Sequence, residues 1–429
     1  MAGTNLSGPR SEIPRVDRNS PVFAVVAGRA NRLFDQTNLH YVCCSLTILM
    51  TRRILFLYLT KHSGHYSAAM AVETAMRRLD GHVESMLLDS FSHANPVLSK
   101  MTLKAYLAAL RTAPEIWEWM YDNPEFKERT AKVRELLNRG NSRKLQRVLD
   151  EFDPDAIVCT QAFACGVMAS WKRATGRKTP VLVGVLTDFV AHRYWADPDV
   201  DLYIAPSEET RLNLISQGVP PERVAAFGIP TNELFQRPVD KDAVIKRLGL
   251  RPDLPKILVM GGSLGLGPMK SVIRKLNKLP QPLDIIVVTG KNEELQEQLT
   301  RKGPKLRHTT RICGFVENVH ELMEIAEIII TKPGGITTAE ALVKKLPMII
   351  INPIPGQEAK NTEYLLSQNV AVEAEDANDV MLFVDEFLRN PRKLWTMREA
   401  AAALGRPRSA ENAAREILRL LIANSAVAA

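Results

Sequence analysis

The sequence predicts an α/β protein of two domains, each built around a parallel sheet. Its 429 residues exceed the usual size of a single domain. Short apolar runs of strand character alternate with helical stretches, and this alternation is typical of parallel sheets. The stretch from residue 230 to 253 carries Pro230, Pro238 and Pro252 among several charges. Because it divides the alternation into two series, we expect the interdomain connection there.

The first series predicts the N-terminal domain, residues 51–238. Its short apolar runs indicate strands that are buried on both faces. The expected strands are 54–59, 83–89, 156–160, 181–186, 202–205 and 223–227. Helical stretches lie between them, such as 67–79, 143–151 and 208–217.

The second series predicts the C-terminal domain, residues 239–408. Its expected strands are 257–260, 284–289, 311–313, 328–331 and 347–352. Ala, Ile and Leu recur at helical spacing over 409–423. We therefore expect residues 409–429 to form a closing C-terminal helix.

The first fifty residues differ from the rest. Pro9, Pro14 and Pro21 interrupt a polar stretch, and the apolar run 41–50 is short and has no small-residue cleavage site after it. A secretory signal is therefore disfavoured. We expect residues 1–50 to be a disordered extension, or to precede a natural start at Met50.

Composition narrows the function classes. The net charge of +8 favours anionic partners, such as lipid headgroups or phosphorylated small molecules. No Lys/Arg-rich run or nucleic-acid-binding motif is present, so we expect no nucleic acid partner. The five cysteines form no CxxC pair, which disfavours disulfides and zinc and favours a reducing cytosol. No apolar run reaches the ~18 residues of a spanning helix, so any membrane contact is expected to be peripheral.

The first candidate site motif follows the first expected strand. The segment Thr60-Lys61-His62-Ser63-Gly64-His65 lies where a parallel sheet faces its ligand crevice. Gly64 permits a tight turn and the close approach of a ligand. His65 suits a general base, because an imidazole pKa near 6.5 allows proton uptake at neutral pH. His62 competes for that role, and the alternative is a histidine that only satisfies the turn.

A glycine-rich loop follows the first strand of the second series. Its sequence is Gly261-Gly262-Ser263-Leu264-Gly265-Leu266-Gly267, which suits a phosphate or a close approach of the two domains. It matches neither GxGxxG nor the P-loop pattern. On its own it is equally consistent with a simple turn.

The strongest motif is the segment from Thr331 to Ala341. Lys332, Pro333, Gly334 and Gly335 form a turn that exposes backbone N–H groups before a helix, with Thr337 and Thr338 at the helix start. A diphosphate can bind there without a metal, because the N–H groups and the helix dipole compensate its charge. The carboxylate of Glu340, one turn later, can hold two ribose hydroxyls. The alternative is a plain loop between a strand and a helix.

Three further segments follow expected strands. Gln357 and Glu358, with Asn361 one turn later, offer donors and acceptors to sugar hydroxyls, or are solvated residues at a helix start. Asp188, with His192 nearby, can orient a base, bind the acceptor or cap a turn. The backbone of the Gly314-Phe315-Val316 segment can read a flat base edge, although Phe315 also suits a core position.

Taken in order, these motifs resemble the family of monogalactosyldiacylglycerol synthases and processive diacylglycerol glucosyltransferases, and more widely the lipid II N-acetylglucosamine transferase. The resemblance covers nearly all of residues 52–425. The matching pieces are His62-Ser63-Gly64-His65, Thr187-Asp188-Phe189 with His192, Gly228-Ile229-Pro230, Gly261-Gly262-Ser263, Gly290-Lys291-Asn292, Gly314-Phe315, residues 332–340 and Pro355-Gly356-Gln357-Glu358. One departure is that the loop before His65 is poorer in glycine than the family's loop often is.

The resemblance implies a GT-B fold, in which two Rossmann-like domains face each other across an interdomain cleft. It also implies inverting sugar transfer from a UDP-sugar donor, with no metal and no cofactor. The catalytic residue that it implies is His65, as general base; Asp188 is the second catalytic candidate, from its position after an expected strand. The substrate-binding residues that it implies are Phe315 and Val316 beside uracil, Gly335, Thr337 and Thr338 around the diphosphate, Glu340 on the ribose, and Gln357 and Glu358 on the donor sugar. The motifs add Gly64, His62, His192, Gly262, Ser263, Lys332 and Gly334 as further substrate-binding candidates.

The acceptor side of the site is predicted from an apolar, aromatic helical stretch over residues 98–121. Leu103, Tyr106, Leu107 and Leu110 share one face, and basic residues accompany them without an acid from 99 to 114. Such a helix suits a bilayer interface, or is a core helix. Because the family places lipid contacts in this insertion, the resemblance favours a helix at the bilayer interface over a core helix.

The function expected from the resemblance is hexose transfer from a UDP-sugar to diacylglycerol. The reaction would occur on the inner face of the cell membrane, on an anionic lipid surface. The alternatives are N-acetylglucosamine transfer to a polyprenyl-linked cell-wall precursor, nucleotide-sugar epimerisation on the same fold, and a non-catalytic nucleotide- or lipid-binding relative. The sequence does not predict an oligomeric state.

Overall fold

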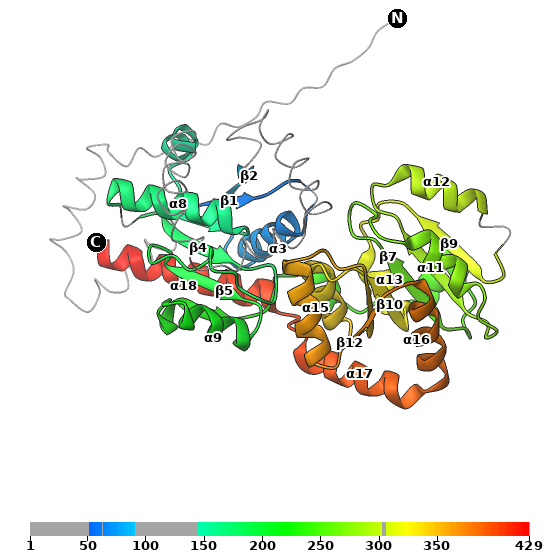
Figure 1. Cartoon of the computed structure of the whole chain (residues 1–429). Coiled ribbons are helices and arrows are strands. Elements are labelled where there is room, and N and C mark those ends of the chain that lie inside the picture. The colour runs from blue at the N-terminus through cyan, green and yellow to red at the C-terminus, as the bar shows by residue number, and fades with distance from the viewer. Residues whose placement is uncertain (1–50, 62, 91–144, 178, 303–305, 429) are drawn as a thin grey trace, which may run out of the picture. The chain divides into compact units, whose positions relative to one another are not determined.

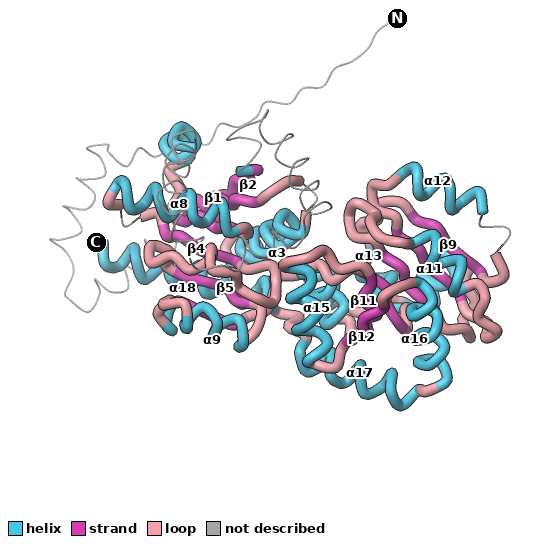
Figure 2. The backbone as a smooth tube through the Cα atoms, in the orientation of Figure 1, coloured by secondary structure: helices cyan, strands magenta, loops and turns pink. Residues whose placement is uncertain are grey.

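The computed structural model describes residues 51–61, 63–90, 145–177, 179–302 and 306–428. Within these residues the chain forms two parallel six-stranded sheets, each with helices packed against it (Figures 1 and 2). This architecture confirms the predicted α/β fold class with two Rossmann-like domains. The expected extension over 1–50, His62 and the stretch 98–121 lie outside the described residues.

The N-terminal sheet has the strand order β2-β1-β3-β4-β5-β6. Its strands are β1 (Arg52–Tyr58), β2 (Val83–Asp89), β3 (Ala156–Cys159), β4 (Val181–Val185), β5 (Leu202–Ala205) and β6 (Val224–Ala226). Its helices are α3 (Gly64–Leu79), residues 145–152, α8 (Ala162–Thr175), α9 (Glu208–Ser216) and the short η1 (Pro221–Arg223). The central strands β1, β3, β4 and β5 are almost wholly buried, because helices cover both faces of the sheet.

The C-terminal sheet has the strand order β12-β11-β10-β7-β8-β9. Its strands are β7 (Lys256–Met260), β8 (Asp284–Val288), β9 (Thr309–Cys313), β10 (Ile328–Thr331), β11 (Met348–Ile351) and β12 (Ala371–Ala374). Its helices are α10 (Lys241–Leu248), α11 (Met269–Leu276), α12 (Glu293–Lys302), α13 (Val319–Ile325), α14 (Gly335–Val343), α15 (Gln357–Ser367), α16 (Ala377–Arg389) and α17 (Pro391–Leu404). The short helix η2 (Glu233–Gln236) lies in the connection between the domains.

The last helix, α18 (Ser409–Ala428), returns to the N-terminal domain. It packs against α3, with Ala413, Ala414 and Ile417 fully buried in a core shared with β1 and α3. The returning chain crosses close to Gly228, where a Cβ atom would lie 2.5 Å from that of Arg406. Two chain passages therefore join the domains, one near residue 230 and one near residue 407.

The strand orders place the motif loops at one edge of each sheet. In both sheets the chain order reverses once, between β1 and β3 in the first and between β7 and β10 in the second. Ligands of open parallel sheets bind where the order reverses, beyond the carboxyl ends of the strands. The loops after β1, β3, β7 and β10 all start at these points. The topology alone therefore indicates that they are candidate site segments.

No helix in the described ranges combines the length and the apolar character needed to cross a bilayer.

Candidate active site

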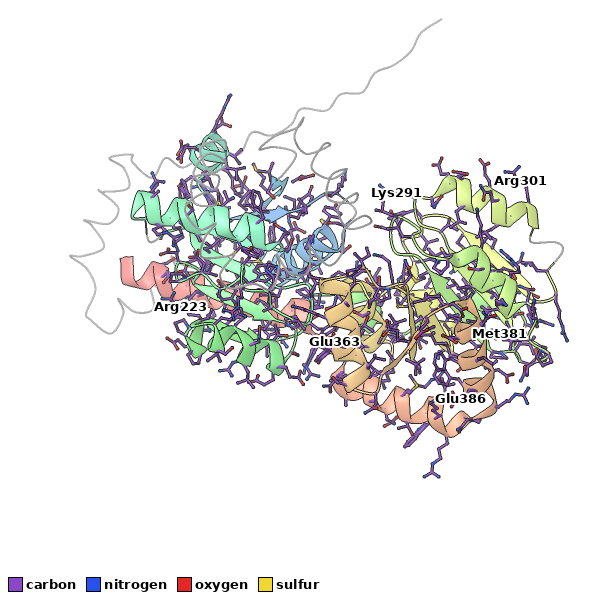
Figure 3. The ribbon with its side chains drawn as sticks, viewed as in Figure 1. Arg223, Lys291, Arg301, Glu363, Met381 and Glu386 are labelled. Atoms are coloured by element: carbon purple, nitrogen blue, oxygen red, sulfur yellow. The ribbon has the colours of Figure 1, made fainter. Side chains whose placement is uncertain are left out.

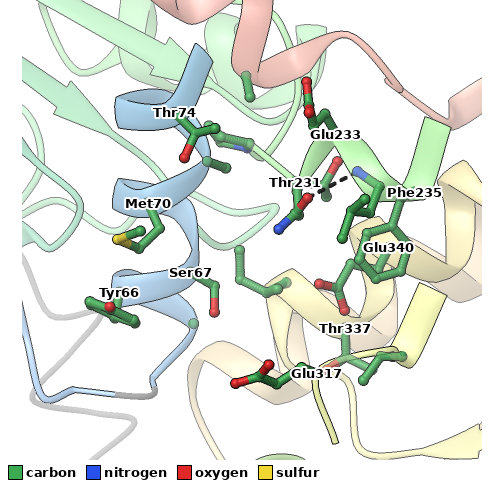
Figure 4. A pocket seen from close by; sticks show the side chains of 18 of the residues that line it. Tyr66, Ser67, Met70, Thr74, Thr231, Glu233, Phe235, Glu317, Thr337 and Glu340 are labelled. Atoms are coloured by element: carbon green, nitrogen blue, oxygen red, sulfur yellow. Dashed lines mark hydrogen bonds between the residues drawn. The ribbon is translucent and has the colours of Figure 1, made fainter. Parts of the chain in front are cut away.

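A pocket of about 580 Å³ lies between the N-terminal and C-terminal motif loops (Figure 4). One wall is α3, from Ser63 to Arg78, and the opposite wall is the start of α14. The loops after β7, β8 and β9, the segment from Pro230 to Gln236 and the start of α18, Ala410 and Glu411, complete it. The pocket thus has walls from both domains, among them the starts of α3 and α14.

The helices that start at this site in the C-terminal domain carry no side-chain cap. The N-cap residue of α14 is Gly334 and that of α15 is Gly356, and neither helix start receives a side-chain hydrogen bond. The first N–H groups of a helix have no intrahelical partner and carry partial positive charge. These helix starts therefore offer N–H groups to an anion, as the sequence predicts for α14.

Gly335 brings the two domains into backbone contact. A Cβ atom at this position would lie only 1.8 Å from the carbonyl oxygen of Thr187, which follows β4. The start of α3 lies beside α14 as well, because a Cβ at Gly64 would lie 3.0 Å from Cγ1 of Ile336. Glycine is thus required at 335 for a steric reason that the local sequence does not reveal.

His65 lies in the first turn of α3, behind the cap that the Ser63 hydroxyl provides. Its Nδ1 lies 2.7 Å from the carbonyl oxygen of Thr160 and 3.1 Å from Oγ1 of Thr187. Because a carbonyl can only accept, Nδ1 carries the proton in the neutral ring, and Nε2 is left as the acceptor. Burial lowers the pKa of His65, opposed by the charge of Asp188, so the ring is neutral at pH 7. This is the form that a general base requires.

Asp188 is held by a residue from the other domain. The side-chain amide of Asn361, in α15, donates to Oδ1 of Asp188 over 2.9 Å. Burial raises the pKa of Asp188, while the Asn361 hydrogen bond and the charges of His65 and Lys332 lower it. The charge of Asp188 in turn raises the pKa of His65, against the effect of burial.

Glu340 and Thr337 project from α14 into the pocket (Figure 4). Burial alone raises the pKa of Glu340 to about 8. Thr338 faces the other way: it is fully buried, and its hydroxyl donates to the carbonyl oxygens of Gly334 and Gly335 over 3.1 and 3.0 Å. Of the two threonines, only Thr337 presents its side chain to a ligand in the pocket.

Lys332 and Glu358 form an ion pair beside the two uncapped helix starts. The second carboxylate oxygen of Glu358 accepts from the backbone N–H of Ile354 over 3.0 Å. Lys332 also lies against the glycine-rich loop, since a Cβ at Gly262 would be 3.2 Å from its Cε. Gln357 is half-buried at the first position of α15. These residues lie next to the pocket without lining it.

The glycine-rich loop after β7 packs on the loop after β8. A Cβ at Gly265 would lie 2.1 Å from the carbonyl oxygen of Thr289, and one at Gly290 would lie 2.4 Å from that of Ser263. Gly262 and Ser263 line the pocket, as do Phe315 and Val316. Phe315 is 48% exposed, and Nζ of Lys291, a residue labelled in Figure 3, lies 5.9 Å from its ring centroid.

The structure thus divides the candidate residues of the sequence analysis into three groups. Those that line the pocket are Gly64, Gly262, Ser263, Phe315, Val316, Thr337 and Glu340. Those beside it are His65, Asp188, Lys332, Gly334, Gly335, Thr338, Gln357 and Glu358. His192 is buried between Tyr194 and Trp195, at 5.8 and 6.0 Å between ring centroids, and so lies in the packing of the N-terminal domain.

Sequence reasoning missed three parts of this site. One is the pair Ala410 and Glu411 at the start of α18. The pocket wall along α3 includes Ser67, Met70, Thr74 and Arg78, whose spacing of three or four residues marks one helix face. That spacing is the available signal, although core faces share it. The segment 231–236, the pocket wall in the connection between the domains, carries no motif. Among the described residues, His, Cys, Asp and Glu do not gather into a group of three that could hold a metal.

Two family models match this chain. The model of monogalactosyldiacylglycerol (MGDG) synthase matches residues 65–231, and the model of the glycosyltransferase family 28 C-terminal domain matches residues 256–412. A processive diacylglycerol beta-glucosyltransferase of Bacillus cereus is 30% identical over 365 residues, which span 84% of this chain and 92% of that protein. A Bacillus anthracis protein of the same name gives the same identity and coverage.

Solved structures share the fold at low identity. The MurG protein of Acinetobacter baumannii superposes with a TM-score of 0.55 and 15% identity, over 86% of this chain and 99% of that one. A UDP-GlcNAc 2-epimerase from Neisseria meningitidis, bound to UDP-GlcNAc, gives 0.56 and 12%, over 86% and 100%. Because both identities are below 25%, the likeness shows the GT-B type of fold and nothing narrower.

Proposed function

The chain belongs to the family of monogalactosyldiacylglycerol synthases and processive diacylglycerol glucosyltransferases, and from that premise we propose that it transfers a hexose from a UDP-sugar to diacylglycerol at the membrane surface. The observation that carries the proposal is the pocket between α3 and α14. It combines the uncapped start of α14 with the carboxylate of Glu340, and the oriented histidine His65 lies beside it.

The donor would bind mainly to the C-terminal domain. Backbone N–H groups at the start of α14, with Thr337, would hold the diphosphate, and Lys332 would add positive charge beside it. Glu340 would accept hydrogen bonds from the ribose hydroxyls. Phe315 and Val316, at the pocket rim, would contact the base. Gln357 and Glu358 would face the sugar.

The chemistry would start at Nε2 of His65. This atom would take the proton of the acceptor hydroxyl while that oxygen attacks the anomeric carbon and the bond to the diphosphate breaks. Attack from the face opposite the leaving group inverts the anomeric configuration. The negative charge of Asp188 would stabilise the imidazolium that forms. The start of α14 would stabilise the departing diphosphate, and this is the basis for proposing a metal-independent reaction.

The acceptor would be reached from an anionic membrane surface. The net charge of +8 supports attraction to such a surface. Because the relatives act on diacylglycerol according to their names, we propose peripheral association with the inner face of the cell membrane.

The test is a donor and acceptor panel. Purified protein is incubated with UDP-glucose, UDP-galactose or UDP-N-acetylglucosamine, together with liposomes that contain or lack diacylglycerol. Mass spectrometry of the lipid extract is expected to show a hexosyl-diacylglycerol with one donor. A product only with a polyprenyl-linked acceptor would move the function to cell-wall precursor synthesis. Conversion of the donor without any acceptor would indicate an epimerase.

A further inference from the structure

Asn361 connects the two domains at the centre of the candidate site. It lies in the second turn of α15 and is fully buried. Its side chain makes three hydrogen bonds: Oδ1 accepts from the backbone N–H of Phe189 over 2.8 Å, and Nδ2 donates to Oδ1 of Asp188 over 2.9 Å and to the carbonyl oxygen of Pro333 over 3.0 Å. Two of these partners follow β4 in the N-terminal domain, and the third belongs to the loop before α14.

The pattern of donors and acceptors fixes the orientation of this amide. Asp188 and Pro333 present only acceptors, so both N–H bonds of Nδ2 are used, and Phe189 presents only a donor, which the amide oxygen receives. A carboxylate at 361 would face two acceptors and donate to neither. A glutamine would carry one methylene too many for a fully buried position. Asparagine is therefore the side chain that satisfies all three groups.

We propose that Asn361 is a positioning residue, which orients the Asp188 carboxylate toward His65 and so sets how readily His65 accepts a proton from the substrate. This inference rests on the proposed function and deepens it. Gln357 and Glu358 lie one turn earlier on the same helix, so α15 ties the sugar side of the site to the base side through Asn361.

The charged groups around Asp188 determine the direction of the effect. They are His65 and, from the C-terminal domain, Lys332 and Glu358. The Asn361 hydrogen bond lowers the pKa of Asp188, and the charge of Asp188 raises the pKa of His65. Loss of the amide therefore raises the pKa of Asp188 further and favours its uncharged form. Negative charge near His65 is then lost, which lowers the pKa of His65. A weaker base takes the proton less readily, so the chemical step is the one that we expect to slow most.

The kinetic test compares Asn361→Ala with Tyr364→Ala. Tyr364 projects from the same helix and also reaches the N-terminal domain, where its ring stacks on Phe189 at 4.6 Å, but it does not contact Asp188. N361A is expected to lower kcat by about 10- to 100-fold, with less than about a 3-fold change in KM for the donor. Its acidic limb of kcat against pH should move to lower pH. Y364A should leave that limb at the pH of the wild type.

A second measurement does not depend on the acceptor. In protein labelled with ¹⁵N-histidine, the titration of the His65 ring is followed by NMR. N361A and Asp188→Asn are each expected to lower its pKa, and the double variant should lower it no further than D188N alone. If N361A does not fold, Asn361→Ser, which retains a hydroxyl, replaces it.

The two measurements separate the inference from the function it rests on. An unchanged His65 titration in N361A, or an equal shift in Y364A, would overturn the positioning role even if lipid glycosylation is observed. An absence of sugar transfer by the wild type would overturn the proposed function, while the NMR titration would still decide the role of Asn361.

Discussion

The two domains contribute different kinds of groups to the pocket. In the N-terminal domain α3, α8 and α9 each begin with a side-chain cap, and the groups near the pocket that carry chemistry are side chains, His65 and Asp188. In the C-terminal domain α14 and α15 begin at glycines without a cap. The N-terminal domain offers side chains, whereas the C-terminal domain offers uncapped backbone N–H groups in addition to the side chains of Lys332, Glu340 and Glu358.

This difference teaches which substitutions are informative on each side. A side chain can be tested by removing atoms. A backbone N–H group cannot be removed that way, and it is tested instead by adding atoms that displace it. Gly335→Ala therefore adds atoms at a C-terminal loop and His65→Ala removes them at an N-terminal one, while Glu340→Gln and the two Thr→Val variants test the side chains of α14.

The largest effect is expected from Gly335→Ala. The new Cβ would lie 1.8 Å from the carbonyl oxygen of Thr187, so the start of α14 must shift away from the loop after β4. Displacement of this size at a reacting centre lowers kcat/KM by at least about 100-fold. Gly334→Ala is the matched control, because its Cβ would lie 4.0 Å from the nearest side chain, Glu358, at an ordinary φ of −67°. Equal activity of the two variants would contradict the close backbone contact.

His65→Ala tests the N-terminal side by removal. We expect kcat to fall by about 100- to 10,000-fold, the usual contribution of a general base, while UDP-sugar binding measured by calorimetry stays within about 3-fold of the wild type. If the N-terminal domain supplies the base and the C-terminal domain binds the donor, this variant must lose turnover and keep donor binding. Turnover near the wild-type level would instead assign the base role to Asp188 or to His62.

Glu340→Gln tests the one titratable group that α14 contributes to the pocket. The raised pKa of about 8 means that Glu340 is mostly protonated at pH 7 in the empty pocket. If ribose hydroxyls bind the ionised carboxylate, donor affinity rises as pH increases through about 8 and is lost about 10-fold per unit below it. The variant should bind the donor more weakly and lose this pH dependence. A wild-type affinity independent of pH between 6.5 and 8.5 would place the ribose elsewhere.

The smallest effects are expected at the neighbouring pair Thr337 and Thr338. Thr337→Val removes a hydroxyl that lines the pocket and should weaken donor binding by about 5-fold, as for one neutral hydrogen bond. Thr338→Val removes a hydroxyl bound only to its own helix, so it should cost about 1 kcal/mol of folding free energy in urea titrations and leave donor binding unchanged. The reverse pattern would mean that the helix turns its other face to the donor.

The sequence was sufficient to predict the fold and most of the site loops, because buried parallel strands leave continuous apolar runs. The expected ranges 83–89, 202–205 and 328–331 coincide with β2, β5 and β10. The strand β12 was missed, because its four residues, Ala371–Ala374, include Glu373 and form no apolar run. The closing helix was expected, but its return to the N-terminal domain depends on packing against α3.

Individual side chains were harder to predict than loops, because their roles depend on contacts far along the chain. The adjacent threonines of α14 read alike in sequence, yet one lines the pocket and the other bonds its own helix. The requirement for glycine at 335 comes from the carbonyl of Thr187, and the role of Asn361 comes from Asp188. The sequence around positions 335 and 361 contains neither Thr187 nor Asp188, so it does not reveal these contacts.

The central claim is that this chain glycosylates a lipid, and UDP release from UDP-sugars measures it most directly. With diacylglycerol liposomes, the wild type should release UDP at a rate that depends on the lipid, and His65→Ala should release almost none while still binding the donor. UDP release that is the same with and without lipid, or donor binding that is absent in the wild type, would contradict the account.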